Sequence, residues 1–231
     1  MRWDIVTITV AAMLCLAWQY RRDRERMRRT RAGFFGECRA LLERSTILQD
    51  DLQFPVLTGR YEGLDVRLEP MVDDMAIRKL PSLWLKISLM APVRYAGAFD
   101  LLIRPRGAEF YSPAFDLPLE VRIPSGWPTD AVIRSDDPAE MPPAETVARH
   151  LHLFDDARMK ELLIAPRGVR LIYQVDQAER SRYAVLRQSE FGEQSLAPDL
   201  ARRLLDAARS VYRSVAAASA ETAAAQPGRP T

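Results

Sequence analysis

An uncharged apolar run near the start of the chain, followed at once by a cluster of arginines, most constrains how this chain can fold. The run extends from Ile5 to Trp18, with Trp3 and Tyr20 on either side. As a helix, the stretch from Trp3 to Tyr20 would rise about 27 Å, close to the hydrocarbon thickness of a thin bilayer. Aromatic rings at its two ends suit the membrane–water interfaces. The sequence therefore predicts a single transmembrane anchor over residues 1–20.

The charges after the run predict its orientation. Arg21 and Arg22 begin a segment, residues 21–31, that holds seven arginines and two acidic residues. Positive charge beside a membrane segment stays on the cytoplasmic side. We therefore expect a single-pass protein of the inner (plasma) membrane with its C-terminal domain in the cytoplasm. The same arginines would attract anionic lipid headgroups.

Two other interpretations of the run fit less well. A cleavable signal peptide needs a positive start and a small-residue cleavage motif. Here Arg2 is opposed by Asp4, and no such motif precedes Arg21. A buried core helix would not change abruptly from an apolar surface to paired arginines. We therefore expect the run to contact lipid.

Composition narrows the partners and the source. The formal net charge is +2, and residues 21–31 contribute more than this excess, so the remainder of the chain is net acidic. A nucleic-acid-binding domain would carry its basic patch on the folded surface, so no nucleic-acid partner is expected. Cys15 and Cys38 are too few for a disulfide framework. The abundance of Arg, Ala and Pro, which have GC-rich codons, indicates a bacterial source.

The body of the chain, residues 54–215, predicts one soluble α+β domain, mostly antiparallel, with hairpins and two or three helices. Short β-prone segments bounded by Pro and Gly carry this prediction. Strands are expected at 55–59, 64–69, 83–90, 98–104, 120–123, 131–134, 161–165, 169–176 and 183–188. The first two would form a hairpin through Tyr61-Glu62-Gly63. Helices are expected at 144–154 and 198–217.

The segments on either side of this domain have simpler patterns. Residues 21–53 predict a basic juxtamembrane helix, running to about residue 49, and a connector; Gly33 and Gly36 interrupt the helix. Residues 216–231 are rich in Ala and Pro and predict a disordered tail.

A seven-residue segment occurs twice, 61 positions apart. Leu-Leu-Ile-Arg-Pro-Arg-Gly at 101–107 recurs as Leu-Leu-Ile-Ala-Pro-Arg-Gly at 162–168. Pro fixes φ and Gly accepts a positive φ, so Pro-Arg-Gly suits a turn between two strands. The pattern predicts either two hairpins with the same turn chemistry or a duplicated β unit.

Four cations are candidate ligands for an anionic group: Arg78 and Lys79, which precede a strand containing Trp84, and Arg106 and Arg167 at the two repeated turns. They would form a binding site only if the fold brings them into one concave pocket. Dispersal over hairpin tips would instead indicate structural roles.

Other clusters favour structural roles. His150 and His152 lie near Asp155 and Asp156, but a spacing of two residues on a helix points the imidazoles to different sides. The acid pairs at 73–74 and 136–137 suit turns or ion pairs. Phosphate-loop, zinc-protease and nucleophile-elbow motifs do not occur in the sequence. We therefore expect no cofactor, no metal and no catalytic residue.

Two functional hypotheses follow. The first is a non-enzymatic, membrane-anchored interaction or assembly module that contacts the bilayer through residues 3–20 and binds a protein partner. The alternative is an enzyme or small-ligand-binding domain that acts on an anionic, membrane-associated substrate.

Overall fold

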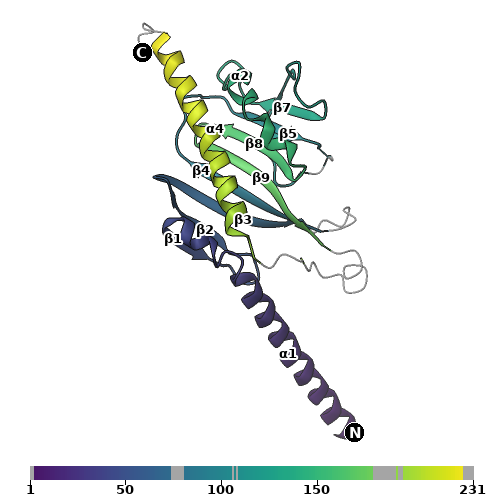
Figure 1. Ribbon diagram of the computed structural model, residues 1–231. Helices are drawn as coiled ribbons and strands as arrows, with labels where there is room; N and C mark the ends of the chain where they lie inside the picture. The colour runs from purple at the N-terminus through teal and green to yellow at the C-terminus, as the bar shows by residue number, and fades with distance from the viewer. Residues whose placement is uncertain are drawn as a thin grey trace.

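The computed structural model describes residues 3–73, 81–105, 107, 109–178, 191 and 195–225. Within these ranges a long N-terminal helix leads into a β-sheet, and a second long helix crosses one face of that sheet (Figure 1). The strand predicted at 183–188 and three of the predicted ligand residues, Arg78, Lys79 and Arg106, lie outside the described residues.

The described strands form one antiparallel sheet of nine. They are β1 (Glu43–Leu48), β2 (Val56–Tyr61), β3 (Leu64–Asp73), β4 (Ser82–Met90), β5 (Phe99–Ile103), β6 (Leu119–Val121), β7 (Ala131–Ser135), β8 (Met159–Ala165) and β9 (Gly168–Gln177). Their order is β1-β2-β3-β4-β9-β8-β5-β7-β6, and each neighbouring pair is antiparallel. The prediction of a mostly antiparallel α+β domain is confirmed.

The hairpin between β2 and β3 forms where the sequence predicts it. Tyr61 pairs with Leu64 across a two-residue turn. Glu62 and Gly63 in that turn have φ values of 50° and 81°. Positive φ at both central positions is the turn geometry that matches the twist of a tight hairpin.

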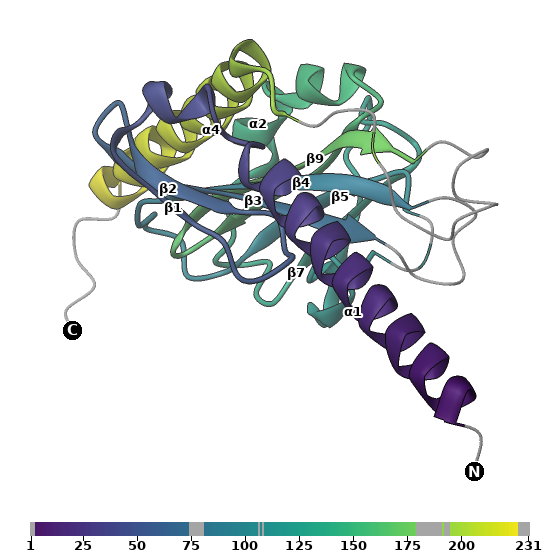
Figure 2. The same cartoon turned by 90° about the horizontal axis from the view of Figure 1, so that it is seen from below.

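Alternation along the strands gives the sheet two different faces. On β4, Leu85, Ile87 and Leu89 are buried on one face, whereas Lys86 and Ser88 on the other face are half-buried. The apolar face is covered by α4 (Pro198–Ala225) and the short α2 (Ala144–Ala148), as Figures 1 and 2 show. α4 contributes an apolar stripe to the core, formed by Leu204, Leu205, Ala208, Val211 and Val215.

The first helix, α1 (Trp3–Ala32), ends well before residue 49, so the prediction of a helix to that point is wrong. Phe34 and Phe35, directly after it, are fully buried. A short 3₁₀ turn (Cys38–Leu41) and the edge strand β1 follow. Burial of these two adjacent phenylalanines directs the chain into the core. The helical spacing of the apolar residues after them did not predict this change of direction. The folded domain therefore begins before residue 54.

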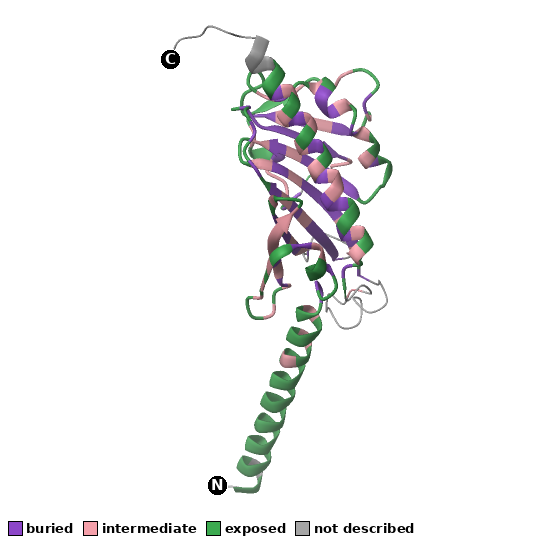
Figure 3. Cartoon of the chain, turned by 60° about the vertical axis from the view of Figure 1, so that its left-hand side comes forward, coloured by how far each residue is buried: buried purple, intermediate pink, exposed green. Residues whose placement is uncertain are grey.

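α1 projects from the domain as a stalk whose residues are almost all exposed (Figure 3). Among the described residues, none of the helices combines the length and the apolar character needed to cross a membrane. The transmembrane anchor predicted over residues 1–20 is therefore not supported. Its uncharged run holds only fourteen residues, a rise of about 21 Å against a hydrocarbon core of about 30 Å.

Two other helical predictions need correction. The helix expected at 144–154 is divided into α2 and a 3₁₀ turn, Leu151–Asp155. α4 continues to Ala225, so the disorder predicted from residue 216 is wrong as far as that residue. Val215 and Ser219 are buried, and the Ser219 hydroxyl donates to the Ala216 carbonyl at 2.8 Å. Tertiary packing therefore extends the helix beyond its obvious apolar stripe.

The two copies of the repeated segment lie side by side. Leu101 on β5 pairs directly with Leu162 on β8, so each copy begins opposite the other. The second copy continues through a tight turn into β9, as the Pro-Arg-Gly pattern predicts. The first copy instead leaves the sheet, and β7 joins β5 only after residues 104–130. The equivalence is therefore confined to one pair of strands.

Candidate functional site

The basic half of α1, residues 21–32, is hydrogen-bonded to the loop between β1 and β2. The Gln49 side-chain amide donates to the Arg28 carbonyl at 3.1 Å and to the Gln53 carbonyl at 3.0 Å. Arg31 donates to the Leu52 carbonyl, and Arg24 forms an ion pair with Asp51. The loop of residues 49–53 is therefore bound along one side of the helix.

Aromatic packing joins this region to the core. The Arg31 guanidinium lies 4.9 Å from the centre of the Phe54 ring. Phe54 packs edge-on against Phe34 at 5.1 Å, and Phe34 against Phe35 at the same separation. Since Phe34 and Phe35 are fully buried, the end of α1 is fixed to the domain rather than hinged on an open linker.

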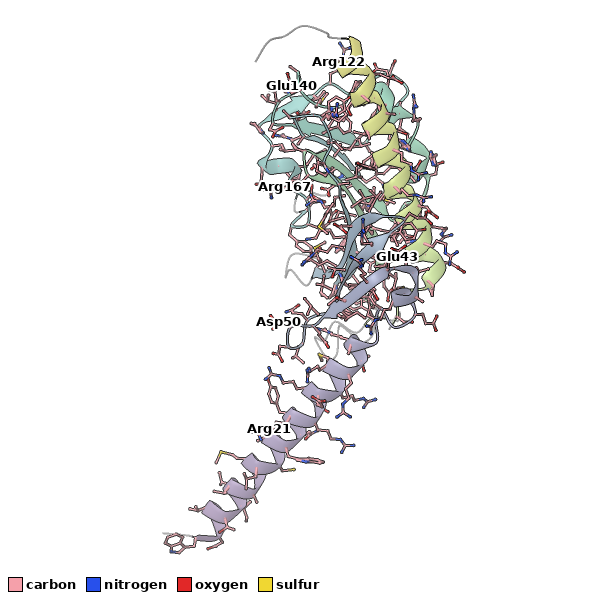
Figure 4. The ribbon with its side chains drawn as sticks, turned by 90° about the vertical axis from the view of Figure 1, so that its left-hand side faces the viewer. Arg21, Glu43, Asp50, Arg122, Glu140 and Arg167 are labelled. Carbon is pink, nitrogen blue, oxygen red and sulfur yellow. The ribbon has the colours of Figure 1, made fainter. Side chains whose placement is uncertain are left out.

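A groove lies between the helix and the loop. Its lining residues are Arg21, Arg24, Glu25 and Arg28 from α1, and Asp51 from the loop, around about 530 Å³. Positions 21, 24, 25 and 28 follow helical spacing and form one stripe. Figure 4 shows the loop that carries Asp50 beside the helix that carries Arg21. We call this the basic groove.

Ion pairs set the charge of the basic groove. Asp51 raises the pKa of Arg24, first through its hydrogen bond and then through its charge. The Glu25 carboxylate lies 2.9 Å from Arg29 Nε, outside the groove, and 3.8 Å from the Arg28 guanidinium. With Glu25 shared between two arginines, the groove keeps an excess of positive charge.

The apolar half of α1 makes a second exposed surface. Trp3 and Ile8 are each 70% exposed, and the Arg22 guanidinium lies 5.3 Å from the centre of the Trp18 ring. The large apolar side chains that are exposed here are Trp3, Val6, Ile8, Val10, Met13, Leu14, Leu16, Trp18 and Tyr20. They lie on all sides of the helix. Of the predicted anchor residues, Trp3, Trp18 and Tyr20 therefore belong to a surface that the domain does not cover, whereas Arg21 lines the basic groove.

A third feature is a pair of buried carboxyl groups, which the sequence analysis missed. Asp100 on β5 and Glu161 on β8 have no exposed surface. Asp100 pairs with Leu163, two residues from Glu161, so both carboxyls lie on the face of the sheet opposite α4. The Arg170 guanidinium on β9 lies 3.3 Å from Glu161. Each acid directly precedes Leu-Leu-Ile, a signal that could have identified the pair.

Burial controls how this pair titrates. Burial, and then the charge of Glu161, raises the pKa of Asp100 well above its ordinary value, and Arg170 opposes the shift. Burial also raises the pKa of Glu161, against the opposing effects of Arg170 and the Ser112 hydroxyl. Both Asp100 oxygens lack a hydrogen-bond partner within the described structure. The pair therefore favours holding a proton over full ionisation.

A small apolar cluster seals this face. Trp84 and Tyr111 lie 4.6 Å apart, and both pack with Leu102, Ala114 and Ile172. The segment that carries Tyr111 thus covers the sheet beside the carboxyl pair. None of these residues lines the basic groove. The pair can store a proton, but the described structure shows no opening through which a substrate would reach it.

Of the four predicted anion ligands only Arg167 can be placed, in the exposed turn between β8 and β9. The choice between a shared anion-binding pocket and dispersal over hairpin tips therefore stays open for these four residues.

His150 and the acid pair at 136–137 lie in structural positions, whereas Asp74 of the other acid pair lies outside the described residues. The His150 ring Nε2 is 2.9 Å from the Ser214 hydroxyl of α4, and burial lowers the pKa of His150. Asp136 accepts hydrogen bonds from the backbone amides of Ala98 and Asp137 at 2.7 and 2.9 Å, which is turn chemistry. No group of three or more His, Cys, Asp or Glu side chains suited to a metal occurs in the described part of the chain.

Comparison with known proteins leaves the chain without a family. No family model matches it, and no curated protein matches it. Among solved structures, the crystal structure of the mycobacterial trehalose monomycolate transport factor A, TtfA, is similar, with a TM-score of 0.35 and 11% sequence identity. The alignment covers 83% of this chain and 80% of that chain. A likeness this remote assigns neither family nor function.

Proposed function

We propose that this chain is a membrane-attached interaction module, in which the apolar half of α1 enters lipid and the basic half holds the sheet domain at the surface. The carrying observation is the exposure of every described large apolar side chain between Trp3 and Tyr20. Covering one such side chain contributes about 1.5–3 kcal/mol. Because these side chains surround the helix, lipid would cover them more completely than a one-sided protein groove.

The arginines give this arrangement a direction and a depth. Residues 21–32 would rise about 18 Å above the end of the apolar half, whereas a headgroup layer is about 5–8 Å thick. Arg21, Arg22 and Arg24 would therefore lie among the headgroups, and the domain would stand just above them. The excess of positive charge supports a cytoplasmic domain at an inner membrane.

The domain would meet a protein partner from this position. Phe110 and Phe115 are 48% and 50% exposed, and Leu119 on the edge strand β6 is 46% exposed. Exposed aromatic side chains near a sheet edge are common in binding surfaces. This supports an interaction role rather than a role in catalysis.

Vesicle flotation tests the membrane attachment. Leu14 and Leu16 in α1 are 66% and 65% exposed, and Leu48 on β1 is 66% exposed. We expect the full chain to float with neutral lipid vesicles, the double variant Leu14→Lys/Leu16→Lys to lose flotation, and Leu48→Lys to keep it. Charged residues at these depths oppose insertion by about 2.5–3.5 kcal/mol each. Equal flotation of the double variant and the parent would disprove the attachment through α1.

A further inference from the structure

We infer that the basic groove is a binding site for a phosphate-bearing lipid headgroup, with Asp51 occupying one of its arginines in the absence of lipid. The inference rests on the proposed attachment of α1, because attachment places Arg21 and Arg24, the end of the groove nearest the apolar half, at headgroup depth. It assigns a ligand class to one side of the helix rather than to the whole arginine-rich segment.

The first support is the placement of the cations. Arg21, Arg24 and Arg28 line one stripe of the helix and face the loop that carries Asp51. Arg22 and Arg26 are equally close to the lipid but do not line the groove. Arginine presents several N–H donors in a planar fork that matches phosphate oxygens. Three such groups around one hollow can hold one phosphate from several sides.

The second support is the state of those cations. Arg21 forms no ion pair with any described residue, and Glu25 is shared between Arg28 and Arg29. The ion pair of Arg24 with Asp51 is about half exposed on both sides. Exposed pairs of this kind contribute little to stability. An incoming phosphate could therefore replace the Asp51 carboxylate on Arg24 with little loss.

The loop gives the site a fixed wall. Gln49 and Arg31 bind the loop to the helix through backbone carbonyls, and those contacts leave the side chains of the groove arginines unused. The hollow therefore does not depend on the Arg24–Asp51 pair alone. Displacement of Asp51 would leave the groove open.

The test compares two doubly substituted full-length chains with the same loss of charge. Arg21→Gln/Arg28→Gln removes two groove arginines, and Arg22→Gln/Arg26→Gln removes two neighbours outside it. Binding is measured on neutral phosphatidylcholine vesicles and on vesicles containing about one-third phosphatidylglycerol. A basic residue near an anionic surface adds about 1 kcal/mol. Losing two charges therefore lowers the preference of either variant for anionic vesicles by up to roughly thirtyfold through diffuse attraction. We expect the groove variant to lose on the order of tenfold more than the other variant.

Two further arms complete the test. Asp51→Asn should strengthen the preference for anionic vesicles, because it removes the internal competitor. Inorganic phosphate should compete only weakly, since lipid also places the headgroup at the right depth. Equal losses in the two double variants would overturn the site in favour of diffuse attraction, and complete competition by inorganic phosphate would overturn the lipid assignment. Failure of the parent chain to bind neutral vesicles would instead count against the attachment itself.

Discussion

Asp100 and Glu161 each directly precede one copy of the repeated segment, and both carboxyls are buried on the same face of the sheet. The pairing of Leu101 with Leu162 produces this relation, because each acid is the residue directly before its leucine. Two carboxyls in a sealed, low-dielectric site resist ionising together. The carboxyl pair should therefore make stability depend on pH.

Replacing Asp100 by Asn should stabilise the protein above pH about 5. The folded pKa of Asp100 is raised by burial, so the folded state keeps a proton that the unfolded chain has lost. Stability of the parent should therefore fall as pH rises from the unfolded pKa of about 4 through the folded pKa. Asp100→Asn should remove part of this fall, by about 1–3 kcal/mol near pH 8, measured by urea unfolding of the full chain in detergent.

Asp65 offers a matched control, since its side chain is 63% exposed. Asp65→Asn should leave the pH profile within about 0.5 kcal/mol of the parent. The opposite result is a parent whose unfolding free energy rises between pH 5 and pH 8, with that rise absent in Asp100→Asn. It would contradict the upward direction of the Asp100 pKa shift.

Gly168→Ala should be strongly destabilising. Gly168 has a φ of 143°, and a Cβ there would collide with the Leu89 carbonyl and lie 3.1 Å from the Ala91 nitrogen. The equivalent glycine of the other copy, Gly107, has a φ of 83° with open space around it. We expect a loss of about 3 kcal/mol or more for Gly168→Ala and about 1 kcal/mol for Gly107→Ala. Similar thermal unfolding midpoints for Gly168→Ala and Gly107→Ala would show that the close approach of Gly168 to the Leu89 carbonyl does not affect stability.

Phe34→Ala should loosen both the core and the base of the stalk. Phe34 is fully buried and contacts Phe35 and Phe54 edge-on. Removing a buried ring costs about 3–5 kcal/mol. Phe110→Ala, at a ring that is 48% exposed, should cost less than about 1 kcal/mol. Hydrogen exchange offers the second measurement. We expect backbone amides of residues 49–54 to exchange faster in Phe34→Ala but not in Phe110→Ala. Unchanged exchange in Phe34→Ala would show that the loop does not depend on the packing of Phe34.

Local patterns in the sequence were sufficient for several elements. Alternation and turn residues located β3, β4 and the Glu62-Gly63 hairpin, because strand period and positive φ are properties of a few neighbouring residues. The apolar stripe of α4 was visible for the same reason. The groove arginines were visible as charge, but not as a stripe that faces Asp51.

What only the tertiary structure decided is which distant segments meet. The turn at Phe34, the entry of β1 into the sheet and the docking of residues 49–53 on α1 depend on burial summed over the whole core. The burial of Asp100 beside Glu161 depends on strands 61 residues apart being paired in one register. The local backbone preferences of each segment follow from its own residues. The pairing of distant strands is selected by the apolar surface that they bury together, and that burial arises only when the segments are in contact.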